Sequence, residues 1–299
     1  MASEHEKNRG LLRRLKDFAR TSISHKQLVA AIYWRRFVSS GPVPIRLPFG
    51  AWWLARHGAL DSTLLGGTFE RDELRFVERY LLPGMSVLDI GAHHGLYSLL
   101  AAKQVGKSGR VIAFEPSPKE RERLREHVRL NFMRNVAIEA LALGPEKSEA
   151  RLYQVAGAED YCNSLRPPAG KAIEKVIQVQ VTSLDEYLEG QRNTKFDFMK
   201  IDTEGAELGI LRGASQFLKA VPRPTLLCEV ADIRTTNWGY HATEIVAFLR
   251  SREFEWFTVG ADGQLVKMCA GHDLRDANLV AIPSERLDET VRRVNDIGR

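Results

Sequence analysis

Residues 87–102, VLDIGAHHGLYSLLAA, begin as an apolar strand, pass through a turn with two glycines and continue into an apolar helix. The strand ends in Asp89, and the turn comprises Gly91, Ala92, His93, His94 and Gly95. Glycines let a backbone approach a ligand closely, and the first turn of a helix offers unpaired amides. The segment therefore predicts a ligand-binding connection between a buried strand and its crossover helix.

The residues missing from this turn narrow the choice of ligand. A nicotinamide fingerprint needs GxGxxG, whose middle glycine admits a pyrophosphate, but His93 stands at that position. No GK[ST] sequence follows, so a triphosphate cradle is not expected either. A ligand with adenosine and amino-acid portions but no phosphate suits this turn. Asp89 could order the turn or hold the ammonium group of such a ligand, directly or through water.

The next apolar strand ends in a second acid. Twenty residues beyond Gly95, the stretch VIAFE ends in Glu115, and Pro116 follows. A carboxylate at the tip of the second strand accepts the ribose hydroxyls of nucleosides on this type of fold. Taken alone, such an acid could be a solvated surface residue, but its spacing from the glycine turn favours ribose binding.

Short apolar runs alternate with helical patterns through the rest of the chain. Helices are expected over 69–82, 96–106, 119–131, 204–218 and 243–251, and strands over 85–90, 110–116, 135–144, 176–183, 196–202, 225–230, 253–260 and 278–283. Such alternation is typical of βαβ units with a parallel sheet. The sequence therefore predicts an α/β protein with helices flanking a mainly parallel, Rossmann-like sheet.

Positive charge is concentrated at the N-terminal end of the chain. Of the net charge of +5, residues 1–40 contribute +6 through nine Lys and Arg against three acids, which leaves −1 for the remainder. A nucleic-acid groove needs an excess of basic residues in the body of the protein. We therefore expect no nucleic-acid partner.

Residues 1–64 are predicted to form a basic helical extension or cap, and residues 65–299 a catalytic domain. Within the extension, HKQLVAAIYWRRFV (25–38) has apolar side chains at helical spacing. Two interpretations remain open for it: a basic amphipathic helix on a membrane surface, or a cap packed on the domain or on a second subunit. We expect a cytoplasmic setting, because the three cysteines are dispersed and the sequence has neither a run of 18 apolar residues nor the apolar core of a secretion signal.

Five stretches of the chain, in order, resemble the FkbM family of S-adenosylmethionine-dependent methyltransferases, which is named for a macrolide O-methyltransferase. They are VLDIGAHHGLYS, VIAFEPSP, TSLDEYL, FMKIDTEGAELGILRGA and LLCEV, within residues 65 to 260, and KIDTEGAE is the most specific string. The resemblance implies a class I methyltransferase fold with a seven-stranded sheet, and S-adenosylmethionine as the cofactor. It also implies an acceptor hydroxyl on a small molecule, sugar, glycan or lipid.

The same resemblance assigns residues to the cofactor. It places Asp89, Gly91, Ala92, His94 and Gly95 in the cofactor turn and Glu115 at the ribose, and we count His93, Pro116 and Ala142 with them. One feature of relatives is missing. Their fifth strand often ends in an acid followed soon by a histidine, whereas here Glu229 precedes Val230, Ala231 and Asp232. No role is therefore assigned to such a histidine.

Acids also cluster around the end of the expected fourth strand. Methyl transfer from a sulfonium is an in-line displacement, which needs an aligned acceptor oxygen and a base for its proton. We predict Asp202 as the base or acceptor orienter, with Glu204 and Glu229 as alternatives and Lys200 as their electrostatic partner. Two other interpretations stay open: Glu204 could cap a helix, and Asp202 could bind only the methionine end of the cofactor.

A nucleic-acid or protein methyltransferase and a non-catalytic cofactor-binding module are the alternative functions. Amino-group methyltransferases of nucleic acids carry [DN]PP[YF] where this chain has KIDTEG, and the intact Asp202-Thr203-Glu204 cluster disfavours an inactive module. Three carboxylates could hold magnesium, but no further ligand stands at an obvious spacing, so no metal is expected. We expect the acceptor to contact residues 41–68, 160–168 and those after 260. Within 160–168, Asn163 and Ser164 either line the mouth of the site or belong to a plain loop.

Overall fold

The computed structural model describes residues 41–56, 58–157, 162–189, 195–269 and 271–296. The expected helix over 25–38 lies outside the described residues. Contacts divide the described chain into two compact units, one with residues 41–45 and 54–69, the other with 46–53 and the chain from residue 70. The first unit contains α3 (Ala59–Gly66), and strands β1 (Val43–Arg46) and β2 (Trp52–Ala55) pair with each other. The expected boundary at residue 64 stays a prediction.

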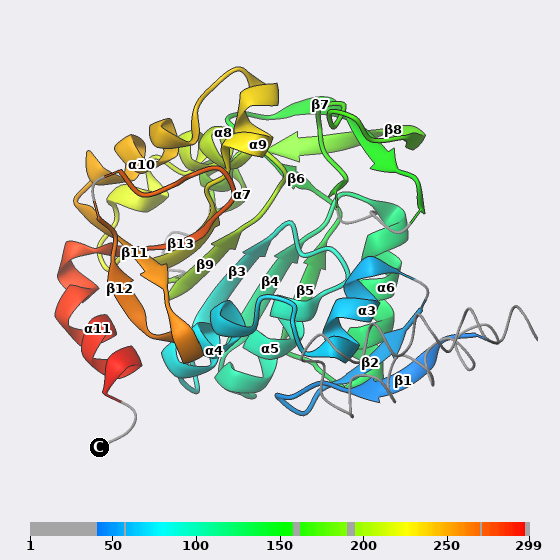
Figure 1. The fold of residues 1–299 in the computed structure, drawn as a ribbon, viewed down its shortest axis with the longest axis horizontal. Helices are drawn as coiled ribbons and strands as arrows, with labels where there is room; N and C mark the ends of the chain where they lie inside the picture. Colours follow the sequence, from blue (N-terminus) through cyan, green and yellow to red (C-terminus); the bar gives the residue numbers. More distant parts are fainter. Residues whose placement is uncertain (1–40, 57, 158–161, 190–194, 270, 297–299) are drawn as a thin grey trace, which may run out of the picture. The chain divides into compact units, whose positions relative to one another are not determined.

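Among the described residues, eight strands form the central sheet in the order β12-β11-β13-β10-β9-β3-β4-β5 (Figure 1). They are β3 (Ser86–Ile90), β4 (Arg110–Phe114), β5 (Val136–Glu139), β9 (Phe198–Ile201), β10 (Thr225–Glu229), β11 (Phe254–Val259), β12 (Leu265–Lys267) and β13 (Asn278–Pro283). Strands β5, β4, β3, β9 and β10 are parallel, and β13 is antiparallel to both β10 and β11. The class I methyltransferase fold is therefore confirmed, with the short strand β12 added at one edge of the seven expected strands.

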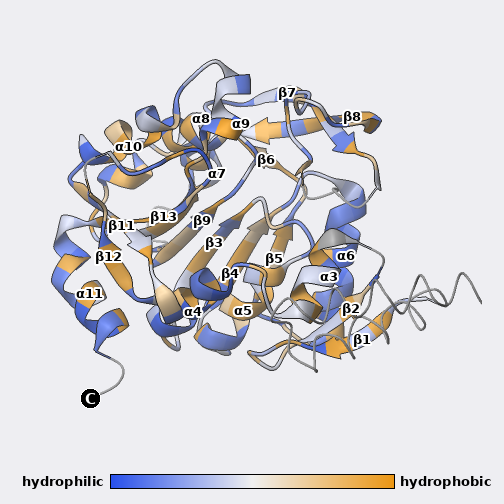
Figure 2. Cartoon of the chain, in the orientation of Figure 1, coloured by the Kyte–Doolittle hydropathy of each residue, from blue (hydrophilic) through white to orange (hydrophobic). Residues whose placement is uncertain are grey.

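Helices pack on both faces of this sheet. They are α4 (Arg71–Tyr80), α5 (Leu96–Val105), α6 (Pro118–Leu130), α7 (Leu184–Tyr187), α8 (Glu207–Gly213), α9 (Asp232–Thr235), α10 (Ala242–Arg250) and α11 (Leu287–Asn295). On one face Phe76 of α4 and Leu100 of α5 are buried, and on the other Leu211 of α8 and Ile245 of α10. Figure 2 shows the apolar strands in orange between helices that carry many hydrophilic residues. Burial of these apolar faces is the main favourable contribution to folding.

Two expected elements differ in the structure. The strand expected over 278–283 does form, as β13, and it inserts between β10 and β11. The strand expected over 176–183 forms as β8 (Ile173–Thr182), which pairs with β6 (Ala142–Leu143) and β7 (Ser148–Val155) in a separate sheet. The helix expected from residue 204 begins only at Glu207, because Glu204 has a left-handed φ of 58° that interrupts helical geometry.

The register of the parallel strands brings the predicted site residues to one edge of the sheet. Asp89 of β3 is level with Lys200 of β9, and Ile90 is level with Ile201. Glu115 follows β4 directly, and Glu229 is the last residue of β10. Ligands of open α/β sheets bind at the carboxyl ends of the strands, so this edge is the place to look for a site. Within the described residues, no helix has the length and apolarity required to span a membrane.

Candidate active site

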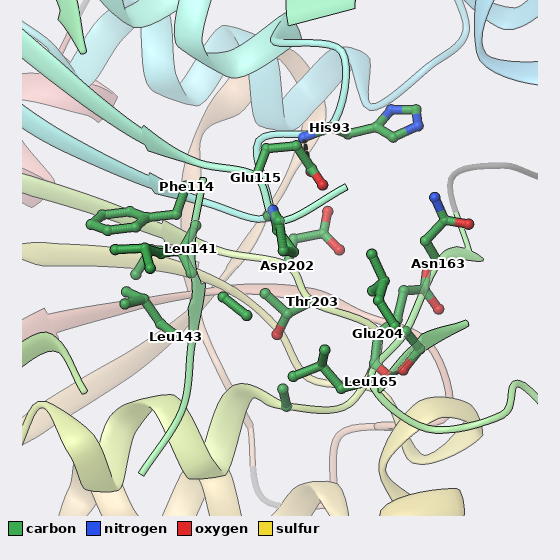
Figure 3. Close-up of a pocket in the computed structure, with 17 residues that line it drawn as sticks. His93, Phe114, Glu115, Leu141, Leu143, Asn163, Leu165, Asp202, Thr203 and Glu204 are labelled. Atoms are coloured by element: carbon green, nitrogen blue, oxygen red, sulfur yellow. Dashed lines mark hydrogen bonds between the residues drawn. The ribbon is translucent and has the colours of Figure 1, made fainter. Parts of the chain in front are cut away.

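A cavity of about 600 Å³, including its open mouth, lies at the carboxyl ends of β3, β4 and β9 (Figure 3). Its apolar lining includes Phe114, Leu141 and Leu143, which lie together on one side in Figure 3. Its polar lining includes the carboxyl groups of Glu115, Asp202 and Glu204, and the loop residues Asn163 and Ser164.

The glycine turn forms one wall of this cavity. Backbone amides of Gly91 and Ala92 donate hydrogen bonds to the Phe114 carbonyl oxygen, at 3.1 and 3.0 Å. Gly91 has a φ of 81°, and a Cβ there would lie 1.8 Å from the backbone oxygen of Asp202. The turn therefore requires glycine at residue 91, because it is tied to the tip of β4 and packs against the end of β9.

Asp89 lies behind the turn and does not line the cavity. Its side chain is buried, and Ser98 Oγ of α5 donates a hydrogen bond to Asp89 Oδ2 at 2.5 Å. Asp89 Oδ1 has no hydrogen-bond partner among the described residues. This placement suits the expected ordering of the turn, and Oδ1 is available to a water that bridges to a ligand.

The two histidines of the turn have different environments. The His93 backbone amide donates to Glu115 Oε2 at 2.8 Å, and in Figure 3 the imidazole points away from the apolar wall. His94 is buried; its ring lies 3.3 Å from Arg123 Nη1, and its carbonyl oxygen lies 2.8 Å from His127 Nδ1. His94 therefore supports the turn from outside the cavity, whereas His93 lines it. Gly95 begins α5, where a Cβ would lie 2.3 Å from Leu124 Cδ1.

Glu115 faces the cavity with both oxygens engaged by the backbone. Oε2 accepts the His93 amide and Oε1 accepts the Ser117 amide, each at 2.8 Å. Burial raises the pKa of the Glu115 carboxyl to about 8, although these two amides oppose the shift. The carboxyl group is thus fixed in orientation, and each oxygen keeps a lone pair for a ligand hydroxyl. Pro116 and Ala142 also line the cavity, as expected for cofactor-binding residues.

The four predicted catalytic residues meet at the ends of β9 and β10. Oxygen atoms of Asp202, Glu204 and Glu229 all lie within 4.8 Å of one another. Lys200 Nζ donates to Asp202 Oδ2 at 2.7 Å, but Lys200 is buried and does not line the cavity. The sequence therefore predicted a cluster that the fold brings together, with Asp202 and Glu204 at its open side.

Charge repulsion and burial shift the proton affinities of this cluster. Burial raises the pKa of Glu204 to about 8, with Arg234 opposing the shift and Asp202 adding to it. Burial and the neighbouring acids Asp202, Glu207 and Glu204 also raise the pKa of Glu229. Burial alone would lower the pKa of Lys200, but the charges of Asp202, Glu70 and Asp89 together outweigh burial, and the pKa lies above its usual value. Lys200 therefore stays charged beside Asp202.

Two residues of this cluster were not predicted from the sequence. Arg234 Nε lies 2.8 Å from Glu204 Oε2 and 3.4 Å from Glu229 Oε1, so it supplies positive charge to both. Glu207 Oε1 accepts bonds from the Thr203 amide and hydroxyl at 2.8 Å and from the Gly205 amide at 3.2 Å. The capping interpretation of Glu204 is therefore wrong, because Glu207 occupies the first turn of α8. The position of Glu207 at the end of KIDTEGAE is the sequence feature from which its role could have been predicted.

The loop residues Asn163 and Ser164 line the cavity, so they are not part of a plain exposed loop. Ser164 Oγ donates to the Glu204 carbonyl oxygen at 3.0 Å, and Trp238 Nε1 donates to the same oxygen at 3.0 Å. These two bonds hold Glu204 in its left-handed conformation at the mouth of the cavity.

The described residues fit S-adenosylmethionine. Glu115 can accept ribose hydroxyls, the side chains of Phe114, Leu141 and Leu143 can flank an adenine, and Asp89 Oδ1 can bind the amino-acid portion through water. No lysine or arginine is among the residues that line the cavity, which suits a cofactor without phosphate.

Comparisons with known proteins give the same assignment. Residues 89–256 match the family model described as Methyltransferase FkbM domain, as the resemblance predicted. A curated relative, Methyltransferase 1 of Beauveria bassiana, is 28% identical over 143 residues, which cover 42% of this chain and 57% of the relative. The matched segment thus spans little more than half of that relative.

Two solved structures are also similar to parts of this chain. A methyltransferase FkbM from Methylobacillus flagellatus is 17% identical, with 74% of this chain and 54% of that chain covered and a TM-score of 0.43. An O-methyltransferase from Bacillus cereus, solved in complex with SAH, is 13% identical, with 70% and 79% covered and a TM-score of 0.40.

Proposed function

Because this chain belongs to the FkbM methyltransferase family, we propose that it binds S-adenosylmethionine in the described cavity and methylates a hydroxyl group. One observation carries the proposal. Glu115, the candidate ribose ligand, and Asp202, the candidate base, line the same cavity directly after β4 and β9, the two strands that flank β3.

Different residues of the cavity wall bind different parts of the cofactor. Glu115 accepts the ribose hydroxyls, and the apolar side chains of Phe114 and Leu143 exclude water from the adenine. When bound, S-adenosylmethionine supplies an electrophilic methyl group, whose bond to sulfur breaks as the bond to the acceptor oxygen forms. The glycine turn and β9 fix the geometry of this step because they are joined through Gly91 and Asp202.

Asp202 is the best candidate to take the hydroxyl proton. Lys200 Nζ holds Asp202 Oδ2, which leaves the other carboxylate oxygen for the acceptor hydroxyl. Glu229 is less suited as the base because it is buried and does not line the cavity. Glu204, with a pKa of about 8, is mostly protonated there and can donate a hydrogen bond to the acceptor.

The mouth of the cavity suits a polar acceptor such as a small polyhydroxylated molecule or a sugar. Asn163, Ser164 and Glu204 present amide, hydroxyl and carboxyl groups there, and these groups pair with hydroxyls. The excess charge of the chain lies in residues 1–40, away from the cavity lining in sequence, which supports a non-nucleic-acid acceptor.

A transfer assay tests the proposal. The protein is incubated with methyl-labelled S-adenosylmethionine and fractionated cell extract, and the labelled fraction is identified. We expect label in a small-molecule or glycan fraction as an alkali-stable methyl ether. The Asp202→Asn variant should bind the cofactor but lose at least about a hundredfold in turnover. Label in nucleic acid, or an alkali-labile methyl ester, would contradict the proposed acceptor.

A further inference from the structure

A polar network lies behind the cavity and links four elements of the fold. Tyr97 Oη of α5 donates a hydrogen bond to Glu70 Oε2 at 2.6 Å, just before α4 begins. Asn278 Nδ2 of β13 donates to Glu70 Oε1 at 3.2 Å. Lys200 Nζ of β9 lies 4.5 Å from the centroid of the Tyr97 ring. Both carboxylate oxygens of Glu70 therefore accept a hydrogen bond within the network.

Tyr97 contacts both charged groups of this network. Its hydroxyl is directed at Glu70, while its ring face supports the ammonium group of Lys200. A cation over an aromatic face is attracted to the ring, and more strongly where water is excluded. Tyr97 and Lys200 are both buried, so water does not compete for this contact.

The same ammonium group holds the candidate base. Lys200 Nζ is 2.7 Å from Asp202 Oδ2, and Asp202 lines the cavity while Lys200 does not. A small displacement of Nζ would therefore rotate the Asp202 carboxylate. Misplacing a reacting group by about 1 Å can cost about a hundredfold in rate.

We propose that Glu70 and Tyr97 are positioning residues for methyl transfer, because they hold the Lys200 ammonium where it orients the Asp202 carboxylate toward the acceptor. This inference rests on the proposed function. Neither residue touches the cavity, so neither is a catalytic residue.

Charge in the network agrees with this role. Removal from water raises the pKa of Glu70 to about 7, against the opposing charge of Lys200. Asp202, Glu70 and Asp89 in turn raise the pKa of Lys200 against the effect of burial. The three acids keep Lys200 protonated. Glu70 is the member of this set farthest along the chain from KIDTEGAE, the string that contains Lys200.

The inference is tested with Glu70→Gln and Tyr97→Phe. Glu70→Gln keeps the size of the side chain and removes its charge; Tyr97→Phe keeps the ring under Lys200 and removes the hydroxyl. We expect each variant to lose about ten- to a hundredfold in kcat. The Kd for S-adenosylmethionine, measured by calorimetry, should stay within about twofold of wild type, because the cofactor wall is unchanged. Tyr97→Leu, which also removes the ring, should lose more than Tyr97→Phe.

Tyr80→Phe is the matched control. Tyr80 is also a buried tyrosine, and its hydroxyl donates to the Asp197 carbonyl oxygen at 2.9 Å, not to the Glu70 network. The Tyr80→Phe variant should lose about as much stability as Tyr97→Phe, and its kcat should be unchanged. Equal loss of kcat in both Tyr→Phe variants, or no loss in Glu70→Gln and Tyr97→Phe, overturns the inference.

A readout independent of turnover separates this inference from the proposed function. Proton–nitrogen NMR of the buried Lys200 ammonium group reports its place over the ring. The signal should move in Tyr97→Leu and Glu70→Gln and stay in place in Tyr80→Phe. If wild type transfers no methyl group, the proposed function fails, while the NMR result still decides whether Glu70 and Tyr97 position Lys200. A signal that is unmoved in both network variants overturns the positioning role.

Discussion

A Cβ on Gly91 would lie 1.8 Å from the backbone oxygen of Asp202, so the cofactor turn and the strand that bears the candidate base are in direct backbone contact. The Asp202 amide also donates to the carbonyl oxygen of Ile90, at 3.1 Å. These two contacts join the halves of the site. A change in the turn is therefore expected to move the base as well.

Gly91→Ala should lower both stability and cofactor binding. The methyl group meets a backbone oxygen, which cannot rotate away, and the residue has a φ of 81°. Overpacking together with a left-handed alanine should cost about 3 kcal/mol or more in the free energy of unfolding. Urea unfolding followed by circular dichroism measures this loss.

Gly239→Ala is the control for this prediction. Gly239 also has a left-handed φ, of 82°, but a Cβ there meets nothing within 4 Å. Its loss should be about 1 kcal/mol, from the backbone conformation alone. Equal losses at the two glycines would show that the contact with Asp202 has no energetic consequence.

Cofactor binding should be linked to the proton on Glu115. Its pKa of about 8 in the free protein means that most molecules carry the proton at pH 7. Ribose hydroxyls donate to a carboxylate, so binding favours the ionised form and releases a proton. Affinity should therefore rise several-fold between pH 7 and 9 and then level off. Calorimetry in buffers of different ionisation enthalpy measures the proton released, and Glu115→Gln should remove it. A wild-type protein that takes up protons on binding would contradict this account.

Local sequence was enough to predict that Gly91, His93 and Glu115 face a site. The turn from Gly91 to Gly95 and the acid at Glu115 are contiguous with their strands, and ligands of such sheets bind at the carboxyl ends of the strands. Asp202 and Glu229 could be placed together for the same reason, since parallel strands end at one edge. Short-range patterns determine these positions.

The rest of the site depends on contacts that no local pattern reveals. Glu70 meets Asn278 across 208 residues of sequence, and β13 reaches that place only because it inserts between β10 and β11. Arg234 lies in the short helix α9 that follows β10, and its direction toward Glu204 is set by tertiary packing. Glu204 itself departs from the expected helix because Glu207 binds the amides of Thr203 and Gly205.

Stability should fall as the pH rises from about 4.5 to 8, in part through Glu204. Its pKa is about 8 when folded and 4.5 in its ordinary state, so the folded protein binds the extra proton between these values. This contribution to stability is full below about pH 4.5 and is lost as the pH rises through 8. Glu204→Gln should reduce the loss of unfolding free energy between pH 6 and 9, measured by urea unfolding.

Glu285→Gln provides the opposite case. Its bond with Arg223 lowers the pKa of Glu285 to about 2, so its contribution is lost only under acid conditions. This variant should be destabilised equally at pH 6 and pH 9. If Glu204→Gln behaves in the same way, Glu204 does not hold the proton assigned to it.

Methyl transfer should continue after metal removal. Arg234 already places a guanidinium nitrogen 2.8 Å from Glu204 and 3.4 Å from Glu229, where a divalent ion would compete with it. We expect initial rates in EDTA to be within about twofold of those in magnesium, whereas Arg234→Gln should lower them. Rates that vanish in EDTA and return with magnesium would show that the three carboxylates hold a metal.

Titration of S-adenosylmethionine into the protein by calorimetry tests the central claim most directly. Wild type should bind one molecule per chain, and Glu115→Ala should weaken that binding at least about tenfold, because it removes the acceptor of the ribose hydroxyls. Glu139→Ala, which alters the acid at the end of the neighbouring strand β5 outside the cavity lining, should bind as wild type does. No heat of binding with wild type, or equal affinity in wild type and Glu115→Ala, would contradict the account.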